Sequence, residues 1–290
     1  MAAIIITYAV VNGGIYALLA IGFSLIFGVA RVVNMAHTGF FMLAAFGLYY
    51  FTKKIGWGDI EAIAVTIVVV TLLGILVYRF IIDRVREHHA AVLLITIALV
   101  MIMESVLLWR FGGETRGVGS LIGGYVEIAG VRVLNQQLLT VGIAALAIIM
   151  VLLLLTKTKL GIAMRATAQD AEIASLMGIS ASRILLVAMG LSVALAVVAG
   201  ILMAPLEGVR PGMWGAPLVT VMVIVTLGGL GSIKGSIIGA FIIALVEQMA
   251  SFLIPEGGYL TGTIILLAMV IVLIVRPAGL FGTMFEEEKL

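Results

Sequence analysis

Residues 4–29 read IIITYAVVNGGIYALLAIGFSLIFGV, an apolar run that contains no charged side chain. A helix rises about 1.5 Å per residue, so this run is long enough to cross a hydrocarbon core of about 30 Å. Of the 290 residues, 63% are hydrophobic and 11% are charged, whereas soluble domains carry about 25% charged residues. A membrane β-barrel shows alternating segments of roughly 10 residues instead. The sequence therefore predicts an all-α, polytopic transmembrane bundle.

The apolar segments predict a single transmembrane domain over residues 1–290, with about 8 or 9 membrane segments of which some are broken or re-entrant. The candidate segments are Ile4–Val29, Val32–Phe51, Ile60–Ile82, Ala90–Trp109, Leu134–Thr156, Ile184–Leu206, Ala216–Leu227, Ile233–Leu253 and Tyr259–Val275. Ala216–Leu227 is too short to cross alone, so we expect a re-entrant segment or a half-helix. Phe111–Asn135 is the largest external loop, and its glycines indicate a short hairpin.

Alternating these segments divides the Lys and Arg residues unevenly between the two sides of the membrane. One side receives eleven, which are Arg31, Arg79, Arg84, Arg86, Lys157, Lys159, Arg165, Arg183, Lys234, Arg276 and Lys289. The other side receives six, which are Lys53, Lys54, Arg110, Arg116, Arg132 and Arg210. Because cytoplasmic loops carry the excess of Lys and Arg, we expect the first set and the C-terminus to be cytoplasmic.

Leu160–Arg183, with the sequence LGIAMRATAQDAEIASLMGISASR, is a polar, helix-forming stretch between two apolar segments. Its apolar residues fall roughly on one helical face, and they are Ile162, Ala166, Ile173, Leu176 and Met177. Gly161 precedes the expected helix and Gly178 is suited to cap its end. The apolar face could enter a groove on a protein partner or lie in the bilayer interface. The mixed charge and small side chains favour a cytoplasmic helix that couples the membrane domain to an ATPase.

Several classes of function are excluded by residues that the chain lacks. It contains no cysteine, which excludes disulfides, thiol catalysis and Cys-ligated metals. It contains no GxxxxGK[ST] motif, so it cannot cradle ATP phosphates itself. The net charge of +2 is too small to indicate nucleic-acid binding. We therefore expect a transport subunit that is not an enzyme and binds no metal or cofactor.

The candidate substrate pathway is drawn from glycine clusters and from polar residues inside apolar segments. Asn12–Gly13–Gly14 and Leu227–Ser232 resemble helix breaks, which occur at membrane depth where they line a cavity or lie inside protein. Ionisable residues within spans, such as Glu104 and Glu247, are functional candidates. The predicted pathway residues are Asn12, Gly13, Asn34, His37, Glu104, Gly228, Gly229, Gly231 and Ser232. Asn34 and His37 could line a passage or bond a neighbouring broken helix; most single glycines serve helix packing.

Glu172–Gly178 (EIASLMG) resembles the EAA-x3-G loop of prokaryotic ABC importer permeases, with Ile173 in place of the first Ala. Further motifs, spread in order along the chain, are similar to the branched-chain amino-acid permeases of the LivH type. They are NGGIYAL at 12–18, VNMAHTG at 33–39, MRATAQD at 164–170, LGGLGSIKG at 227–235 and VRPAGLFG at 275–282. Thr38 and Lys234 depart from the family pattern, which usually has Gly and often has Pro there.

The resemblance implies an importer in a prokaryotic plasma membrane that carries leucine, isoleucine or valine into the cytoplasm. This chain would pair with a second, LivM-like permease. Two LivG/LivF-like ATPases would bind ATP and Mg, and an extracytoplasmic binding protein would deliver the substrate. The residues that the resemblance assigns to ATPase coupling are Arg165, Ala166, Asp170, Glu172, Ala174 and Gly178.

Three alternatives remain open from the sequence. A permease for urea or short-chain amides resembles the same family closely. An ion-coupled secondary transporter would use paired acidic residues in two repeats, for which Glu104 and Glu247 are candidates. A passive channel would work alone and would not need the stretch Leu160–Arg183.

We predict that Gly178→Glu and the charge reversal Glu172→Lys each leave membrane insertion normal but abolish ATP-dependent uptake, because both changes alter the docking helix. The measurement is substrate uptake into vesicles that contain the whole transporter, with the amount of inserted chain as control. Full uptake by both variants would contradict the docking role.

Overall fold

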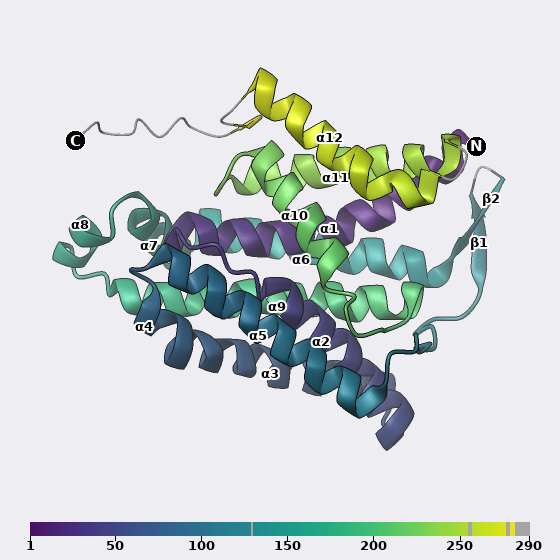
Figure 1. Ribbon diagram of the computed structural model, residues 1–290, viewed down its shortest axis with the longest axis horizontal. Helices are drawn as coiled ribbons and strands as arrows, with labels where there is room; N and C mark the ends of the chain where they lie inside the picture. Colours follow the sequence, from purple (N-terminus) through teal and green to yellow (C-terminus); the bar gives the residue numbers. More distant parts are fainter. Residues whose placement is uncertain (129, 255–256, 277–278, 282–290) are drawn as a thin grey trace.

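The computed structural model describes residues 1–128, 130–254, 257–276 and 279–281, which form a bundle of helices with one small hairpin (Figure 1). The helices are α1 Ala2–Ala30, α2 His37–Tyr49, α3 Asp59–Val77, α4 Asp83–Val85, α5 His89–Phe111, α6 Asn135–Lys157, α7 Lys159–Gln169, α8 Ala171–Leu176, α9 Ala181–Glu207, α10 Gly215–Gly228, α11 Ile233–Leu253 and α12 Gly257–Val275. The π-helical turns η1 Tyr50–Ile55 and η2 Tyr78–Ile82 extend α2 and α3. The predicted hairpin is confirmed as strands β1 Tyr125–Ile128 and β2 Val131–Leu134.

Six described helices are long and apolar enough to cross a membrane, namely α1, α3 with its extension, α5, α6, α9 and α11. Two shorter apolar helices, α10 and α12, accompany them. The prediction for Ala216–Leu227 is confirmed, because α10 has 14 residues and is about 21 Å long, less than the hydrocarbon thickness. Part of the closing motif (residues 277–278 and 282) and Lys289 lie outside the described residues.

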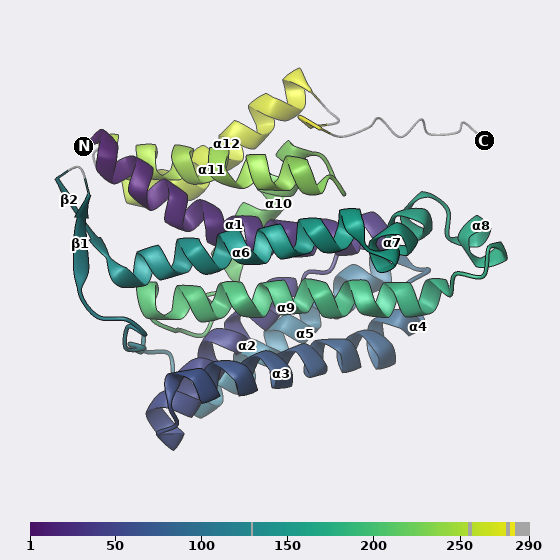
Figure 2. The same ribbon diagram turned by 180° about the vertical axis from the view of Figure 1, so that it is seen from behind.

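Helices α1 and α9 form the centre of the bundle. In the most apolar stretch of each, 78% and 72% of the residues are buried, against 22% in α5 and in α6. Helix α1 packs against α6, α9, α10 and α11, and α9 also packs against α2 and α3. The outer helices therefore present apolar surface to the lipid, while α1 and α9 are surrounded by protein (Figures 1 and 2).

Two sets of three helices are arranged in opposite directions. The first set is α1, α2 and α3, with 29, 13 and 19 residues; the second is α9, α10 and α11, with 27, 14 and 21. Each set has a long helix, a short helix that begins inside the bundle, and a returning helix. Helix α1 packs against α11 as α9 packs against α3. This pattern is that of an inverted repeat in a transporter.

The helix break predicted at Asn12–Gly13–Gly14 is wrong, because α1 is continuous from Ala2 to Ala30. Those glycines serve close packing instead. A Cβ on Gly13 would lie 2.6 Å from the ring of Phe241 on α11, and one on Gly14 would lie 3.1 Å from Ala144 on α6. A sequence window cannot distinguish a glycine that ends a helix from one that admits a neighbour.

The break predicted at Leu227–Ser232 is confirmed as the turn between α10 and α11. Gly229 and Gly231 have φ values of 97° and 82°, which side chains rarely adopt. Ser232 caps α11 by accepting a hydrogen bond from the Gly235 amide at 3.1 Å. The amides of Leu280 and Phe281 donate to the last carbonyls of α10, at 2.7 and 3.1 Å. These bonds satisfy carbonyls that a helix end leaves unpaired.

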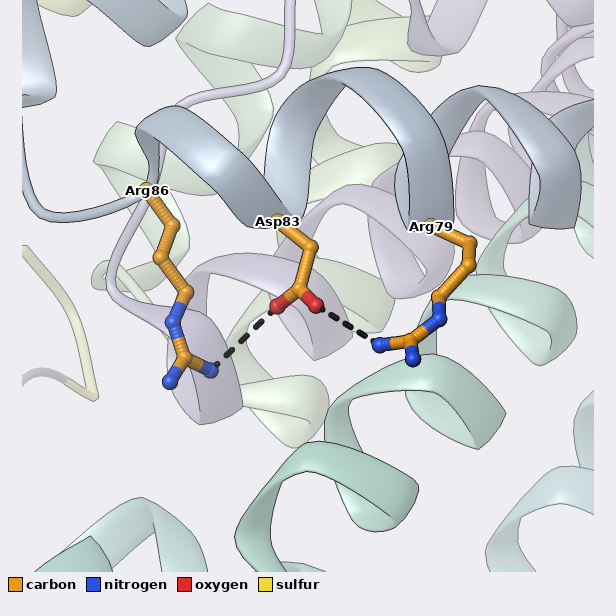
Figure 3. Close-up of polar contacts among 3 residues, drawn as sticks. All are labelled: Arg79, Asp83 and Arg86. Carbon is orange, nitrogen blue, oxygen red and sulfur yellow. Dashed lines mark hydrogen bonds and ion pairs between the residues drawn. The ribbon is translucent and has the colours of Figure 1, made fainter.

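The two predicted sets of cations lie at opposite ends of the bundle. Arg31, Arg79, Lys157 and Arg183 are near the helix ends that surround α7, whereas Lys53, Arg110 and Arg132 belong to the end that carries the hairpin (Figure 1). At the α7 end, Asp83 forms ion pairs with Arg79 at 3.1 Å and with Arg86 at 3.6 Å (Figure 3). One carboxylate thus offsets two of the cations, and a positive excess stays on that end.

We predict that Gly235→Leu destabilises the bundle by about 3 kcal/mol, because a side chain there would overlap the carbonyl of Gly228 and force α10 and α11 apart. Gly142→Leu is the matched control, since its Cβ meets nothing within 4 Å. Thermal unfolding of both variants in detergent measures the difference. Equal stability would show that the contact between α10 and α11 does not limit folding.

Candidate functional site

A cavity of about 830 Å³ lies between α1, α9, α10, α11 and α12. Tyr16 of α1 and Thr220 of α10 line its inner part, while Thr115, Gly208 and Arg210 line the part nearest the hairpin end. The cavity therefore extends to the end opposite α7. Its volume lies in the range of small-molecule sites, which is about 300–1,000 Å³.

Several ionisable groups line the cavity. Glu247 of α11, Glu207 at the end of α9 and Arg210 in the following loop all line it. The Tyr16 hydroxyl lies within interaction distance of the Glu247 carboxyl group, and Arg210 lies close enough to attract Glu207. One side chain from each of three elements therefore brings charge to the same space.

The predicted pathway residues Asn34 and His37 lie elsewhere, in a segment that enters the bundle without helical structure. The sequence analysis treated Val32–Phe51 as a continuous span; in fact residues 32–36 are irregular and α2 begins only at His37. The segment is nevertheless buried, with Val32, Asn34 and Ala36 at most 3% exposed. Irregular backbone at this depth is tolerated because protein surrounds it.

The backbone donors of this segment find partners in side chains. The Asn34 side chain accepts from the Ala36 amide at 3.1 Å, and Thr96 of α5 accepts from the Met35 amide at 3.2 Å. The His37 ring contacts the Leu19 carbonyl at 3.0 Å and the Ser192 hydroxyl at 3.2 Å, and so joins α1, α2 and α9. His37 therefore bonds two continuous helices, α1 and α9, and Asn34 stabilises its own irregular segment.

The other predicted pathway residues fall in three separate places. Asn12 and Gly13 lie on α1, where Gly13 meets α11. Glu104 of α5 accepts a hydrogen bond from the Trp214 indole at 2.8 Å and so holds the loop before α10. Gly228, Gly229, Gly231 and Ser232 form the α10–α11 turn near the α7 end. The structure does not bring these residues into one cavity with Glu247.

Tyr16, Thr220 and Ser251 line the cavity but were not among the predicted pathway residues. Glu207, Arg210 and Glu247 also line the cavity and are not among the predicted pathway residues, although the sequence analysis gives Glu247 as a functional candidate. A signal was available for Glu247, because a carboxylate in the middle of an apolar segment is costly. For Tyr16 and Thr220 no such signal exists, since both residue types are common in membrane helices.

The stretch Leu160–Arg183 forms two helices, α7 and α8, in place of the single helix expected. Thr158 caps α7 by accepting from the Gly161 amide at 3.1 Å, so Gly161 lies inside the first turn rather than before it. A side chain at Gly161 would overlap the last carbonyls of α6. Arg165 donates to the Leu155 carbonyl of α6. Helix α7 is therefore attached tightly to the end of α6.

Helix α8 extends beyond the rest of the bundle (Figures 1 and 2). Asp170 has extended backbone, ends α7 and caps α8 by accepting from the amides of Glu172 and Ile173, both at 2.9 Å. Gly178 has φ 84° and its amide donates to Ser175, while the Ile179 amide donates to Ala174. These two bonds form a Schellman motif, so the predicted capping role of Gly178 is confirmed.

Among the described residues, none covers the apolar side chains at the end of α8. Leu176 and Met177 are 82% and 80% exposed, and Ile173 is 60% exposed. Ala174 is the buried residue of α8. Among the described residues, no group of three His, Cys, Asp or Glu side chains is placed to hold a metal ion.

We predict that Thr96→Val costs about 1–3 kcal/mol of stability, because it leaves the part-buried Met35 amide without its acceptor. Thr66→Val is the matched control: Thr66 is 0% exposed, and its hydroxyl has no hydrogen-bond partner among the described residues. We expect this control to be as stable as the original chain or more so. Thermal unfolding in detergent separates the two, and equal losses would contradict the role of Thr96.

Comparison with known proteins gives a consistent family. The family described as "Branched-chain amino acid transport system / permease component" matches residues 5–273. The high-affinity branched-chain amino acid transport system permease protein LivH of Escherichia coli K12 is 26% identical, covering 93% of this chain and 92% of that protein. BraD of Pseudomonas aeruginosa is 23% identical with the same coverage, and a probable LivH of Methanocaldococcus jannaschii is 26% identical over 97% of this chain and 93% of its own.

A solved structure, PsaBC from Streptococcus pneumoniae in complex with Fab, has a chain with a related fold. The TM-score is 0.51 at 13% identity, covering 93% of this chain and 91% of that one. At this identity the likeness concerns the fold alone. Because the family match extends over residues 5–273, the chain belongs to the family of permease components of branched-chain amino acid transport systems.

Proposed function

We propose that this chain is the membrane-spanning permease subunit of an ABC importer that carries branched-chain amino acids into the cytoplasm. The observation that carries the proposal is α8, a capped apolar helix that extends from the cation-rich end of the bundle. The names of the relatives, which are all branched-chain amino acid permeases, supply the substrate class and favour it over urea or amides.

The shape of α8 supports a docking role. It has only 6 residues, and an isolated helix of that length is unstable in water. The cap at Asp170 and the Schellman motif at Gly178 hold it in place, although its tip exposes Leu176 and Met177. Exposed apolar side chains on a helix that is held in place by its caps are suited to bind in a groove of a partner protein.

The predicted coupling residues divide into two roles in this proposal. Arg165 and Asp170 maintain the shape, the first through the Leu155 carbonyl and the second as the cap of α8. Ala174 is buried, and Gly178 ends α8 with a positive φ. Ala166 is half-buried on α7. Glu172, Leu176 and Met177 are the groups exposed to an ATPase.

The mechanism follows from how α7 is attached. Helix α7 packs against α1, α6 and α9, and α1 and α9 form the centre of the bundle. A push on α8 therefore reaches the two helices that line the 830 Å³ cavity with Tyr16 and Glu207. ATP binding and hydrolysis on the partner subunits would change access to the cavity, and this chain supplies no chemistry to the ATP.

The orientation and the assembly are part of the same proposal. The positive excess at the α7 end favours a cytoplasmic position for α7 and α8 in a prokaryotic plasma membrane. The partners are a LivM-like permease, two LivG/LivF-like ATPases that hold ATP and Mg, and an extracytoplasmic binding protein. The hairpin end, to which the cavity extends, faces that binding protein.

The alternative of an ion-coupled transporter loses its main support in the structure. It needs acidic residues at corresponding places of two repeats. Glu104 lies on α5 and Glu247 on α11, but the counterpart of α11 in the inverted arrangement is α3. Glu104 also accepts a hydrogen bond from the Trp214 indole. Neither a carrier nor a passive channel has a use for the exposed tip of α8.

We predict that Leu176→Glu lowers the affinity for the partner ATPases by about 30-fold, because it puts a carboxylate into the centre of an apolar contact. The chain is coexpressed with its partner subunits, and the ATPases that copurify are measured. Ile60→Glu is the matched control, since Ile60 is 84% exposed and lies at the hairpin end. Undiminished copurification with Leu176→Glu would refute the docking role of α8.

A further inference from the structure

Glu247 is the least expected side chain in the bundle. It lies in the C-terminal half of α11, one of the helices long and apolar enough to cross a membrane. Its Oε2 atom is buried and has no hydrogen-bond partner among the described residues. Burial of a carboxylate oxygen in that position costs free energy unless a positive group or a hydrogen-bond donor contacts it. Beside the Tyr16 hydroxyl, which lies near the carboxyl group, this oxygen is left to interact with a ligand.

The surroundings of Glu247 favour a cation. Glu207 lines the same cavity and lies close enough to repel the Glu247 carboxylate. Among the described lining residues Arg210 is the one cation, and it lies close to Glu207. The described lining therefore has two carboxyl groups and one guanidinium. A bound positive group would relieve the repulsion and satisfy the free oxygen.

The remaining lining residues match the rest of an amino acid. The hydroxyls of Thr220, Ser251 and Thr261 provide donors and acceptors in the same cavity. Met203, Met213 and Ile265 provide apolar wall. A zwitterion with an aliphatic side chain needs both kinds of surface, whereas an inorganic cation has no use for the apolar side.

The cavity is closed towards the α7 end within this chain. The Ser24 and Ser236 hydroxyls meet at 2.5 Å between α1 and α11. Beyond them, a Cβ on Gly28 would lie 3.5 Å from the backbone of Gly231. The ligand therefore enters from the hairpin end and meets Glu247 before it reaches the tightly packed part of the bundle.

We propose that Glu247, together with the Tyr16 hydroxyl, is the binding point for the α-ammonium group of the transported amino acid. The proposal rests on the function proposed above, and it assigns a substrate contact to a residue of the permease itself. Tyr16 comes from α1 and Glu247 from α11, so a bound ammonium group would bridge the two helices that pack most extensively in the bundle.

The test uses the complete transporter in proteoliposomes, with its binding protein loaded with labelled leucine. We expect Glu247→Gln, which is uncharged but similar in shape, to lower the initial rate of uptake about 10-fold or more, because a charge-assisted hydrogen bond is lost. Glu247→Asp keeps the charge and retains the larger part of the rate. Glu127→Gln, an exposed carboxylate on the hairpin, is the matched control and transports normally.

A second measurement does not depend on the rate of uptake. The chain has no cysteine, so Ser251→Cys in nanodiscs gives one target for a polar thiol reagent inside the cavity. We expect ATP and the leucine-loaded binding protein to slow its labelling. Thr156 is exposed near the C-terminal end of α6. The variant Thr156→Cys is the control, and we expect its labelling to be equal with and without leucine. The ATPases that copurify with each variant establish that the complex is assembled.

The outcomes separate this inference from the proposed function. Uptake by Glu247→Gln within about twofold of the original transporter, or labelling of Ser251→Cys that leucine does not change, overturns the ammonium site while the importer function stands. If the unmodified complex carries no branched-chain amino acid, the proposed function itself fails, whatever the effect of Glu247.

Discussion

Close contact between the backbone of α1 and its neighbours is the constraint on which the rest of the structure depends. In a bilayer, lipid tails are as apolar as leucine, so helices associate through close packing rather than through hydrophobic burial. Gly13 admits the ring of Phe241, and Gly28 lies against Gly231. On the other side of the bundle, a side chain at Gly200 of α9 would overlap the carbonyl of Phe41. Small residues at these points let neighbouring helices approach α1 and α9 closely.

The central pair makes the two short helices possible. Helices α2 and α10 each begin inside the bundle, after a segment without regular structure, and such segments expose backbone groups that lipid cannot satisfy. Side chains of the surrounding helices replace the missing partners, as Thr96 does for Met35. The half-helices leave space beside α1 on the hairpin side, and the cavity with Tyr16 and Thr220 occupies it.

The same helices connect the two ends of the molecule. Helix α1 contacts α7 near its C-terminal end and contributes Tyr16 to the cavity. Between these points, Ser24 and Gly28 hold α1 against the start of α11. A displacement of α7 relative to the bundle must therefore act first on this tightly packed region. That region is where a passage from the cavity towards the α7 end would have to open.

The sequence by itself determined the membrane class, the family, the short polar helices of Leu160–Arg183 and the α10–α11 turn, because long apolar runs, EIASLMG and LGGLGS are local signals. Tertiary structure decided the rest. Asn12–Gly14 lies within the continuous helix α1, and His37 begins α2. Contacts with neighbouring helices decide whether such residues continue a helix or interrupt it. Tyr16, Glu207 and Glu247 share a cavity although they are far apart in the chain. Which polar groups meet depends on helix packing, and hydropathy carries no information about partners.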